Sequence, residues 1–102
     1  MAAFREVAKV GQIAENRGLC VEVDGRRIAL FKVGGQIHAI EDECSHAGGS
    51  LSEGLVEGTE VQCPLHRARF SLVTGEALAP PAYEGVQTFK VRVRADAVEL
   101  EL

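Results

Sequence analysis

Residues 19–41 read LCVEVDGRRIALFKVGGQIHAIE, and this stretch decides the fold class. Apolar residues alternate with polar ones along it, which is the period of strands that bury one face. The alternation breaks at Asp24-Gly25 and at Gly34-Gly35, and both dipeptides are typical of tight hairpin turns. The pattern predicts three antiparallel strands, near residues 19–23, 27–33 and 36–40.

The C-terminal stretch, TFKVRVRADAVELEL over residues 88–102, shows the same alternation on both sides of Ala95-Asp96. A second hairpin is therefore expected, with one face buried and the other in water. The residues expected to face inward are Phe89, Val91, Val93, Val98, Leu100 and Leu102.

Shorter strands are expected near residues 4–8, 60–63 and 67–72, the last followed by a turn at Thr74-Gly75. Residues 9–17 allow at most a short helical turn. These elements together predict an all-β fold, an antiparallel sandwich or barrel.

The composition limits the classes of function. A chain of 102 residues is expected to form one domain, and its 46% hydrophobic and 25% charged residues are ordinary for a water-soluble protein. The formal net charge of −4 disfavours nucleic acid as the main partner. No apolar run approaches the roughly 20 residues of a membrane span, and the N-terminus lacks the apolar region of a secretory signal. With three cysteines, the expected location is the reducing cytoplasm.

Two loops between the strand-rich regions carry paired metal-ligand residues. The first contains Cys44-Ser45-His46 and the second Cys63-Pro64-Leu65-His66, which gives the pattern C-x-H-x16-C-x-x-H. A structural zinc site is one interpretation, because zinc accepts two cysteines and two histidines. Zinc sites usually place the two cysteines together, whereas here each loop contributes one cysteine and one histidine. That order suits a two-iron cluster with cysteines on one iron and histidines on the other.

On these motifs the sequence resembles Rieske-type ferredoxins, most closely the small ferredoxin components of bacterial systems that hydroxylate aromatic rings. The resemblance covers essentially the whole chain and implies a single Rieske domain over residues 1–102. It implies cluster-binding loops at about 42–50 and 62–70 and a covering loop at about 79–83, where Pro80-Pro81 stands. It also implies one [2Fe–2S] cluster, with Cys44 and Cys63 on the inner iron and His46 and His66 on the outer iron.

The chain departs from the high-potential Rieske proteins of cytochrome bc-type complexes. Those proteins carry an extra cysteine in each ligand loop, where this chain has Gly49 and Leu65, so no disulfide can link the loops. They also place a serine and a tyrosine after the second ligand histidine, where this chain has Ala68 and Phe70. Fewer hydrogen bonds to sulfur destabilise the added electron, so a potential at the low end of the Rieske range is expected.

Other residues near the motifs are assigned by type. The charged residues beside the ligand pairs have two interpretations: a solvated face without a specific partner, which is the more common case, and a docking surface at the cluster rim. His38 and Cys20 are predicted to be strand residues outside the site. The rim residues are Glu41, Asp42, Glu43, Arg67 and Arg69.

The resemblance implies an electron carrier rather than an enzyme. Such a protein takes single electrons from a flavin-containing, NAD(P)H-dependent reductase and passes them to a terminal aromatic-ring-hydroxylating oxygenase. The chain itself has only His38 left after the two cluster histidines, too few for the two-histidine, one-carboxylate iron site of an oxygenase. The alternatives are the Rieske-like small subunit of a nitrite reductase, the ferredoxin of a multicomponent monooxygenase, and a zinc-stabilised interaction module without redox function.

Overall fold

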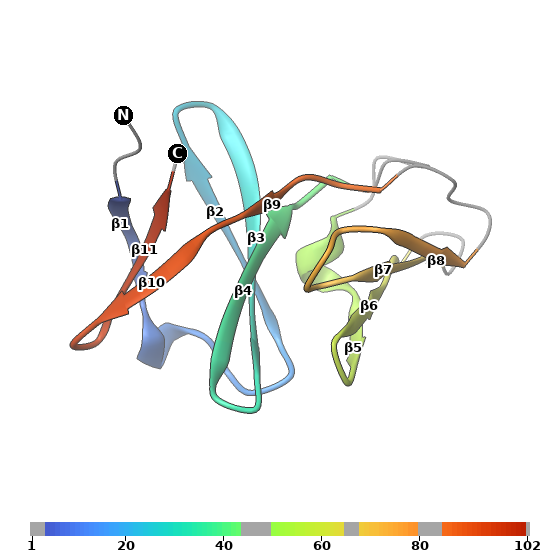
Figure 1. Ribbon diagram of the computed structural model, residues 1–102, viewed down its shortest axis with the longest axis horizontal. Coiled ribbons are helices and arrows are strands. Elements are labelled where there is room, and N and C mark those ends of the chain that lie inside the picture. The colour runs from blue at the N-terminus through green and yellow to red at the C-terminus, as the bar shows by residue number, and fades with distance from the viewer. Residues whose placement is uncertain (1–3, 44–49, 65–67, 80–84, 102) are drawn as a thin grey trace.

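A computed structural model describes residues 4–43, 50–64, 68–79 and 85–101, and their strands form three antiparallel sheets (Figure 1). None of the helical segments in these ranges is long and apolar enough to cross a membrane. The terminal sheet has the order β1-β11-β10, the central sheet β2-β3-β4-β9 and the small sheet β5-β6-β7-β8. The elements are β1 (Phe4–Lys9), the 3-10 turn η1 (Val10–Gln12), β2 (Gly18–Val23), β3 (Arg26–Val33), β4 (Gln36–Glu41), the 3-10 turn η2 (Leu51–Glu53), β5 (Leu55–Glu57), β6 (Glu60–Gln62), β7 (Arg69–Ser71), β8 (Ala77–Ala79), β9 (Thr88–Phe89), β10 (Val91–Arg94) and β11 (Ala97–Glu101).

The central sheet confirms the three strands predicted over residues 19–40, each within one residue at either end. Both hairpin turns adopt the left-handed backbone that their sequences predict. Asp24 and Gly25 have φ values of 52° and 79°, and Gly34 and Gly35 have 59° and 80°. Two consecutive positive φ values are the mark of a type I′ turn, whose twist matches that of the strands it joins.

The C-terminal hairpin, β10–β11, is also confirmed, with Val98 and Leu100 fully buried. Phe89 and Val91 are partly buried and pack against the same core. The expectation for Val93 is wrong, because this side chain is 46% exposed. Val93 pairs with Val98 but lies on the edge strand of the terminal sheet, beyond the residues that cover the core. Leu102 lies outside the described residues.

Strand β3 is buried on both faces and separates two hydrophobic cores. Ile28 and Leu30 face the terminal sheet, where they meet Val98 and Leu100. Ala29 and Phe31, the residues between them, face the opposite way and join the core of the small sheet. Because successive side chains in a strand point to opposite faces, a run of four buried apolar residues supplies both cores at once.

The small sheet is built from strands of three residues each, and only two of its four strands are expected from the sequence. Strands β6 and β7 correspond to the strands predicted near 60–63 and 67–72. Strands β5 and β8 are not predicted. The first strand of the predicted C-terminal hairpin is divided into β9, in the central sheet, and β10, in the terminal sheet. Val61 and Phe70 lie opposite each other on β6 and β7, and both are fully buried against the face that β3 presents.

Gly75 connects the small sheet to the segment that returns to the central sheet. Its φ is +78°, and a Cβ atom built there would lie 2.1 Å from the carbonyl oxygen of Val86. The same segment is held by a hydrogen bond from the Val86 N–H to the Gly75 carbonyl, 2.8 Å long. Position 75 therefore requires glycine both for its backbone conformation and for the close approach of residue 86.

We expect Gly75→Ala to lower the free energy of unfolding by about 1–3 kcal/mol or more, because the substitution adds backbone strain and a steric clash. Urea denaturation followed by circular dichroism measures this change. Gly58→Ala is the matched control, since Gly58 has a φ of +58° but no atom within 4 Å of the added Cβ. Equal losses in the two variants would show that the contact with Val86 carries no weight.

Candidate metal centre

Cys63, the first ligand residue of the second motif, directly follows β6 at the inner edge of the small sheet. Its side chain is 1% exposed and belongs to the core shared with β3. The Cys63 N–H donates to the Ala68 carbonyl at 2.6 Å, which brings together the residues on either side of 64–67. The two ends of the second motif, Cys63 and Ala68, are therefore fixed by the β6–β7 pair, and we call them the base of this motif. His66 lies outside the described residues.

Residues 43 and 50 bring together the two sides of the first motif. Glu43 and Ser50 form an isolated antiparallel bridge, and the Leu51 N–H donates to the Asp42 carbonyl at 2.6 Å. Cys44 and His46 lie between these anchors and outside the described residues. The two ends of the first motif, residues 42–43 and 50–52, thus lie together directly after β4, and we call them the base of this motif.

The turn η2 places the bases of the two motifs against each other. Leu51, in η2, is fully buried in the same core as Cys63. Gly54 ends this turn, and a Cβ atom there would lie 2.2 Å from the carbonyl oxygen of Gln62, the residue before Cys63. The segment after the first motif therefore packs directly on the strand that leads into the second. This arrangement fits two loops that supply ligands to one shared centre.

Asp42 has no part in an exposed rim, so neither interpretation of the charged residues, a solvated face or a docking surface, holds for it. Its side chain is 0% exposed, and it is the one buried charged residue in the part of the chain that the structure describes. The carboxylate accepts hydrogen bonds from the Ser52 N–H at 2.8 Å, the Arg27 guanidinium at 2.8 Å and the Ser50 hydroxyl. The Cys20 thiol lies 3.6 Å away.

Burial and hydrogen bonding act on Asp42 in opposite directions. Loss of solvent raises the pKa of this carboxyl, while the hydrogen bonds from Ser50 and Ser52 and the positive charge of Arg27 lower it. The lowering prevails, so the pKa lies below the ordinary value of an aspartate. Asp42 is accordingly ionised at neutral pH, and Arg27 balances its charge.

The remaining rim residues differ in how free their charges are. Glu43 is exposed, whereas the Glu41 carboxylate accepts a hydrogen bond from the Gln87 N–H at 2.7 Å. Arg69 is paired on the outer face of the small sheet with Glu57 at 2.7 Å and Glu60 at 3.3 Å. Arg67 lies outside the described residues. Of the four rim residues that the structure describes, Glu43 is thus the one left exposed without such a partner.

The two residues that the departure from high-potential Rieske proteins singles out are both fully buried. Ala68 and Phe70 follow the second motif and have 0% exposed surface. Neither side chain carries a hydroxyl group, so neither can donate a hydrogen bond to a sulfur atom. Gly48, Gly49, Leu65 and the covering segment with Pro80 and Pro81 lie outside the described residues.

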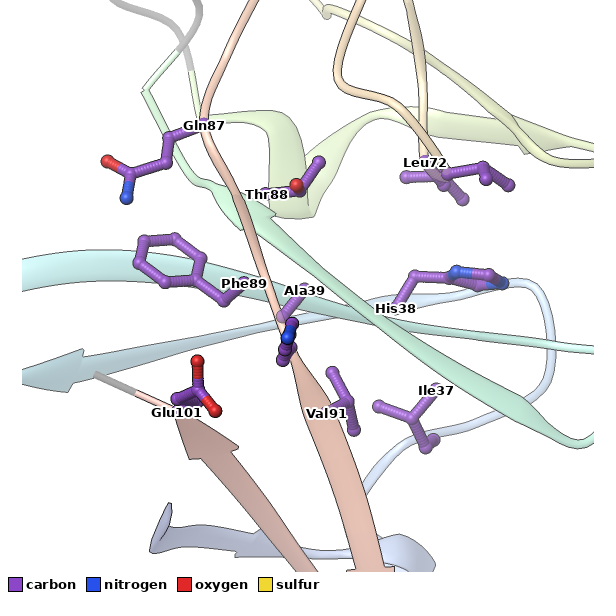
Figure 2. A pocket seen from close by; sticks show the side chains of 11 residues that line it. Ile37, His38, Ala39, Leu72, Gln87, Thr88, Phe89, Val91 and Glu101 are labelled. Carbon is purple, nitrogen blue, oxygen red and sulfur yellow. The ribbon is translucent and has the colours of Figure 1, made fainter. Parts of the chain in front are cut away.

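Cys20 and His38 lie on strands of the central sheet, as predicted for residues outside the site. His38 lines a pocket of about 580 Å³ between β4, β9 and the turn after β7. Figure 2 shows that the lining side chains diverge: His38 lies on one side of the segment that carries Thr88, while Gln87 and the ring of Phe89 lie on the other side. Polar groups that point apart do not form a specific ligand site.

Within the described ranges, no three histidine, cysteine, aspartate or glutamate side chains gather as metal ligands. Three of the four predicted ligands fall outside those ranges, and the fourth, Cys63, is held at the point where the two loop bases meet. Two thiolates and two imidazoles are the donor set of a mixed cysteine and histidine two-iron centre. The residues present therefore fit such a group.

Comparison with known proteins agrees with a two-iron centre. The sequence profile of the Rieske [2Fe-2S] domain family matches residues 3–90. The ferredoxin component of the naphthalene 1,2-dioxygenase system of Pseudomonas aeruginosa is 37% identical over 91 residues, which are 89% of this chain and 88% of that protein. The ferredoxin of carbazole 1,9a-dioxygenase from Nocardioides aromaticivorans superimposes with a TM-score of 0.91 at 29% identity, covering 96% of both chains. The ferredoxin in a solved complex of oxygenase and ferredoxin of carbazole 1,9a-dioxygenase superimposes with a TM-score of 0.89 at 29% identity, covering 96% of this chain and 92% of that chain.

The chain belongs to the Rieske [2Fe-2S] domain family. Its all-β fold is the Rieske ferredoxin fold. The cofactor of this family is one Rieske-type [2Fe-2S] cluster, so the alternative interpretation as a zinc site is wrong. Within that family, the protein is a ferredoxin, an electron carrier rather than a catalytic subunit.

The half-buried imidazole of His38 is expected to make the free energy of unfolding depend on pH. Burial lowers the pKa of His38 below 6.5, because a charged ring loses water there. The unfolded chain therefore binds a proton at this residue at a higher pH than the folded protein does. The stabilisation is complete above about pH 6.5 and is lost as the pH falls toward the lower folded pKa.

We expect His38→Gln to flatten the pH dependence of the free energy of unfolding in the window just below about pH 6.5. Denaturant titrations of the wild type and the variant at a series of pH values measure the difference. Parallel curves for the two proteins through this window would contradict the assignment to His38.

Proposed function

We propose that Cys44, His46, Cys63 and His66 hold the cluster and that this one domain, residues 1–102, carries single electrons in the cytoplasm. The donor would be a flavin-containing, NAD(P)H-dependent reductase, and the acceptor a terminal aromatic-ring-hydroxylating oxygenase. The observation that carries the proposal is that the bases of both motifs meet in one core, which contains Leu51 and Cys63. The relatives of the chain are ferredoxins of dioxygenase systems. A solved complex of oxygenase and ferredoxin, found for a structural neighbour, supports the choice of acceptor.

The cluster, when bound, supplies one-electron oxidation and reduction. The chain supplies a rigid support for it, because Cys63 and both loop bases are tied to sheets that share a continuous core. The buried Cys63 keeps water from that side of the centre. Because Cys63 and the flanking residues of both motifs are held in a packed core, the protein is suited to repeated electron transfer rather than to binding a substrate.

The ligand assignment is tested by assaying iron and labile sulfide in protein produced without oxygen, with a visible spectrum and the electron paramagnetic resonance of the reduced form. We expect two irons and two sulfides per chain, as a [2Fe–2S] cluster requires, and the loss or alteration of the signal in His46→Cys and His66→Ala. Cys20→Ser is the matched control and should keep the spectrum, since a serine hydroxyl can still donate to Asp42. Zinc without sulfide, or loss of the cluster in Cys20→Ser, would overturn the assignment.

The midpoint potential of the wild type should lie in the lower part of the Rieske range of about −150 to +300 mV. The reason is the apolar surface of Ala68 and Phe70, which offers no hydroxyl donor to stabilise the reduced state. Ala68→Ser and Phe70→Tyr should each raise the potential measured by redox titration. Phe89→Tyr, in the core on the other side of β3, should leave it unchanged. A wild-type value above about +100 mV would contradict this account.

A further inference from the structure

The buried carboxylate of Asp42 joins segments that lie on opposite sides of the first ligand motif. Asp42 stands at the end of β4, two residues before Cys44, while Ser50 and Ser52 follow the motif. The carboxylate receives the Ser52 N–H on Oδ1 and the Ser50 hydroxyl on Oδ2. Arg27, from β3, donates to Oδ2 as well. One side chain thus connects both sides of the loop to the central sheet.

The backbone around this carboxylate repeats the connection. The Asp42 N–H donates to the Arg27 carbonyl at 3.1 Å, and the Asp42 carbonyl accepts from Leu51 at 2.6 Å. A charged group that is removed from water is costly unless its hydrogen bonds are satisfied. Here every oxygen of the carboxylate has a partner, so the network specifies one arrangement of the loop base.

Strand β2 presses on the same point from the other side. A Cβ atom at Gly18 would lie 2.4 Å from the Ser52 carbonyl oxygen and 2.8 Å from the Ser52 Cα. Ser52 is therefore held between the Asp42 carboxylate and the backbone of β2. Through Gly54, the same turn packs on Gln62 and so on the base of the second motif.

We infer that Asp42 is a positioning residue for the cluster: it holds together the two ends of the first ligand motif, residues 42–43 and 50–52, and ties both ends to the central sheet. This inference rests on the proposed ligands Cys44 and His46. Asp42 acts through Ser50, Ser52 and Arg27 rather than by touching the cluster. Its removal should therefore change how firmly the cluster is held before it changes how firmly the sheets are folded.

The test measures the rate at which an iron chelator removes the cluster from holoprotein, beside the midpoint potential and the resonance spectrum. Asp42→Asn keeps the shape of the side chain but cannot accept from Ser52, Ser50 and Arg27 together. We expect about a tenfold faster loss, equivalent to about 1.4 kcal/mol, and an altered resonance spectrum. Ser50→Ala removes one hydrogen bond and should give a smaller change in the same direction.

Two controls separate positioning from general stability. Asp24→Asn makes the same substitution at an exposed turn, where asparagine suits the φ of 52°. Val98→Ala destabilises the core on the far side of β3 without contact with the loop bases. Both should lose the cluster at close to the wild-type rate, even if Val98→Ala unfolds at lower denaturant than Asp42→Asn.

A wild-type rate of cluster loss in Asp42→Asn would overturn the inference. An equally fast loss in Val98→Ala would also overturn it, because cluster loss would then follow the stability of the whole fold. If Asp42→Asn does not fold, the comparison of Ser50→Ala with Asp24→Asn decides the question by the same criterion. Gly18→Ala gives an independent test, because it displaces Ser52 without altering the carboxylate, and it should also speed the loss. Absence of iron and sulfide from the wild type would instead refute the proposed function.

Discussion

The two-sided burial of β3 is the constraint on which the structure depends. Four consecutive apolar residues, from Ile28 to Phe31, alternate between two cores and leave no face of the strand in water. Each core alone is small, as expected for a chain of this length. Because both cores share β3, the small sheet packs against an apolar face that its own three-residue strands could not supply. The part of the molecule that carries Cys63 is thus packed against the strand that is buried on both faces.

Polar contacts then fix what apolar packing leaves free. Burial of Leu51 and Cys63 brings the two loop bases into one core, but hydrophobic contact is not directional and does not set their register. Hydrogen bonds at Asp42 and between Cys63 and Ala68 supply that direction. The region around Cys63 therefore combines apolar packing with a small number of directional hydrogen bonds. Such a division suits a protein in which the ligands must hold their positions while the oxidation state changes.

Sequence reasoning succeeded where the signals are local. The hairpins of the central sheet were predictable because glycine and aspartate at their turns permit positive φ values. The spacing of Cys44, His46, Cys63 and His66 indicated a two-iron centre, and the family relationship agrees with it. The three-residue strands β5 and β8 show no period and could not be found in this way. Asp42 read as part of an acidic run, because its burial depends on Arg27 and Ser52, which are distant in the sequence.

The pairing of β1 with β11 places Phe4 opposite Glu101 at the edge of the molecule farthest from the small sheet (Figure 1). A tether attached at either of these strands would leave from the same side. An electrode, a bead or a fused reductase joined there would face away from the loop bases. The protein could then be immobilised in a uniform orientation with the bases of the two motifs directed toward the solution. The antiparallel pairing of β1 with β11 thereby also determines the orientation in which the molecule can be attached to a surface.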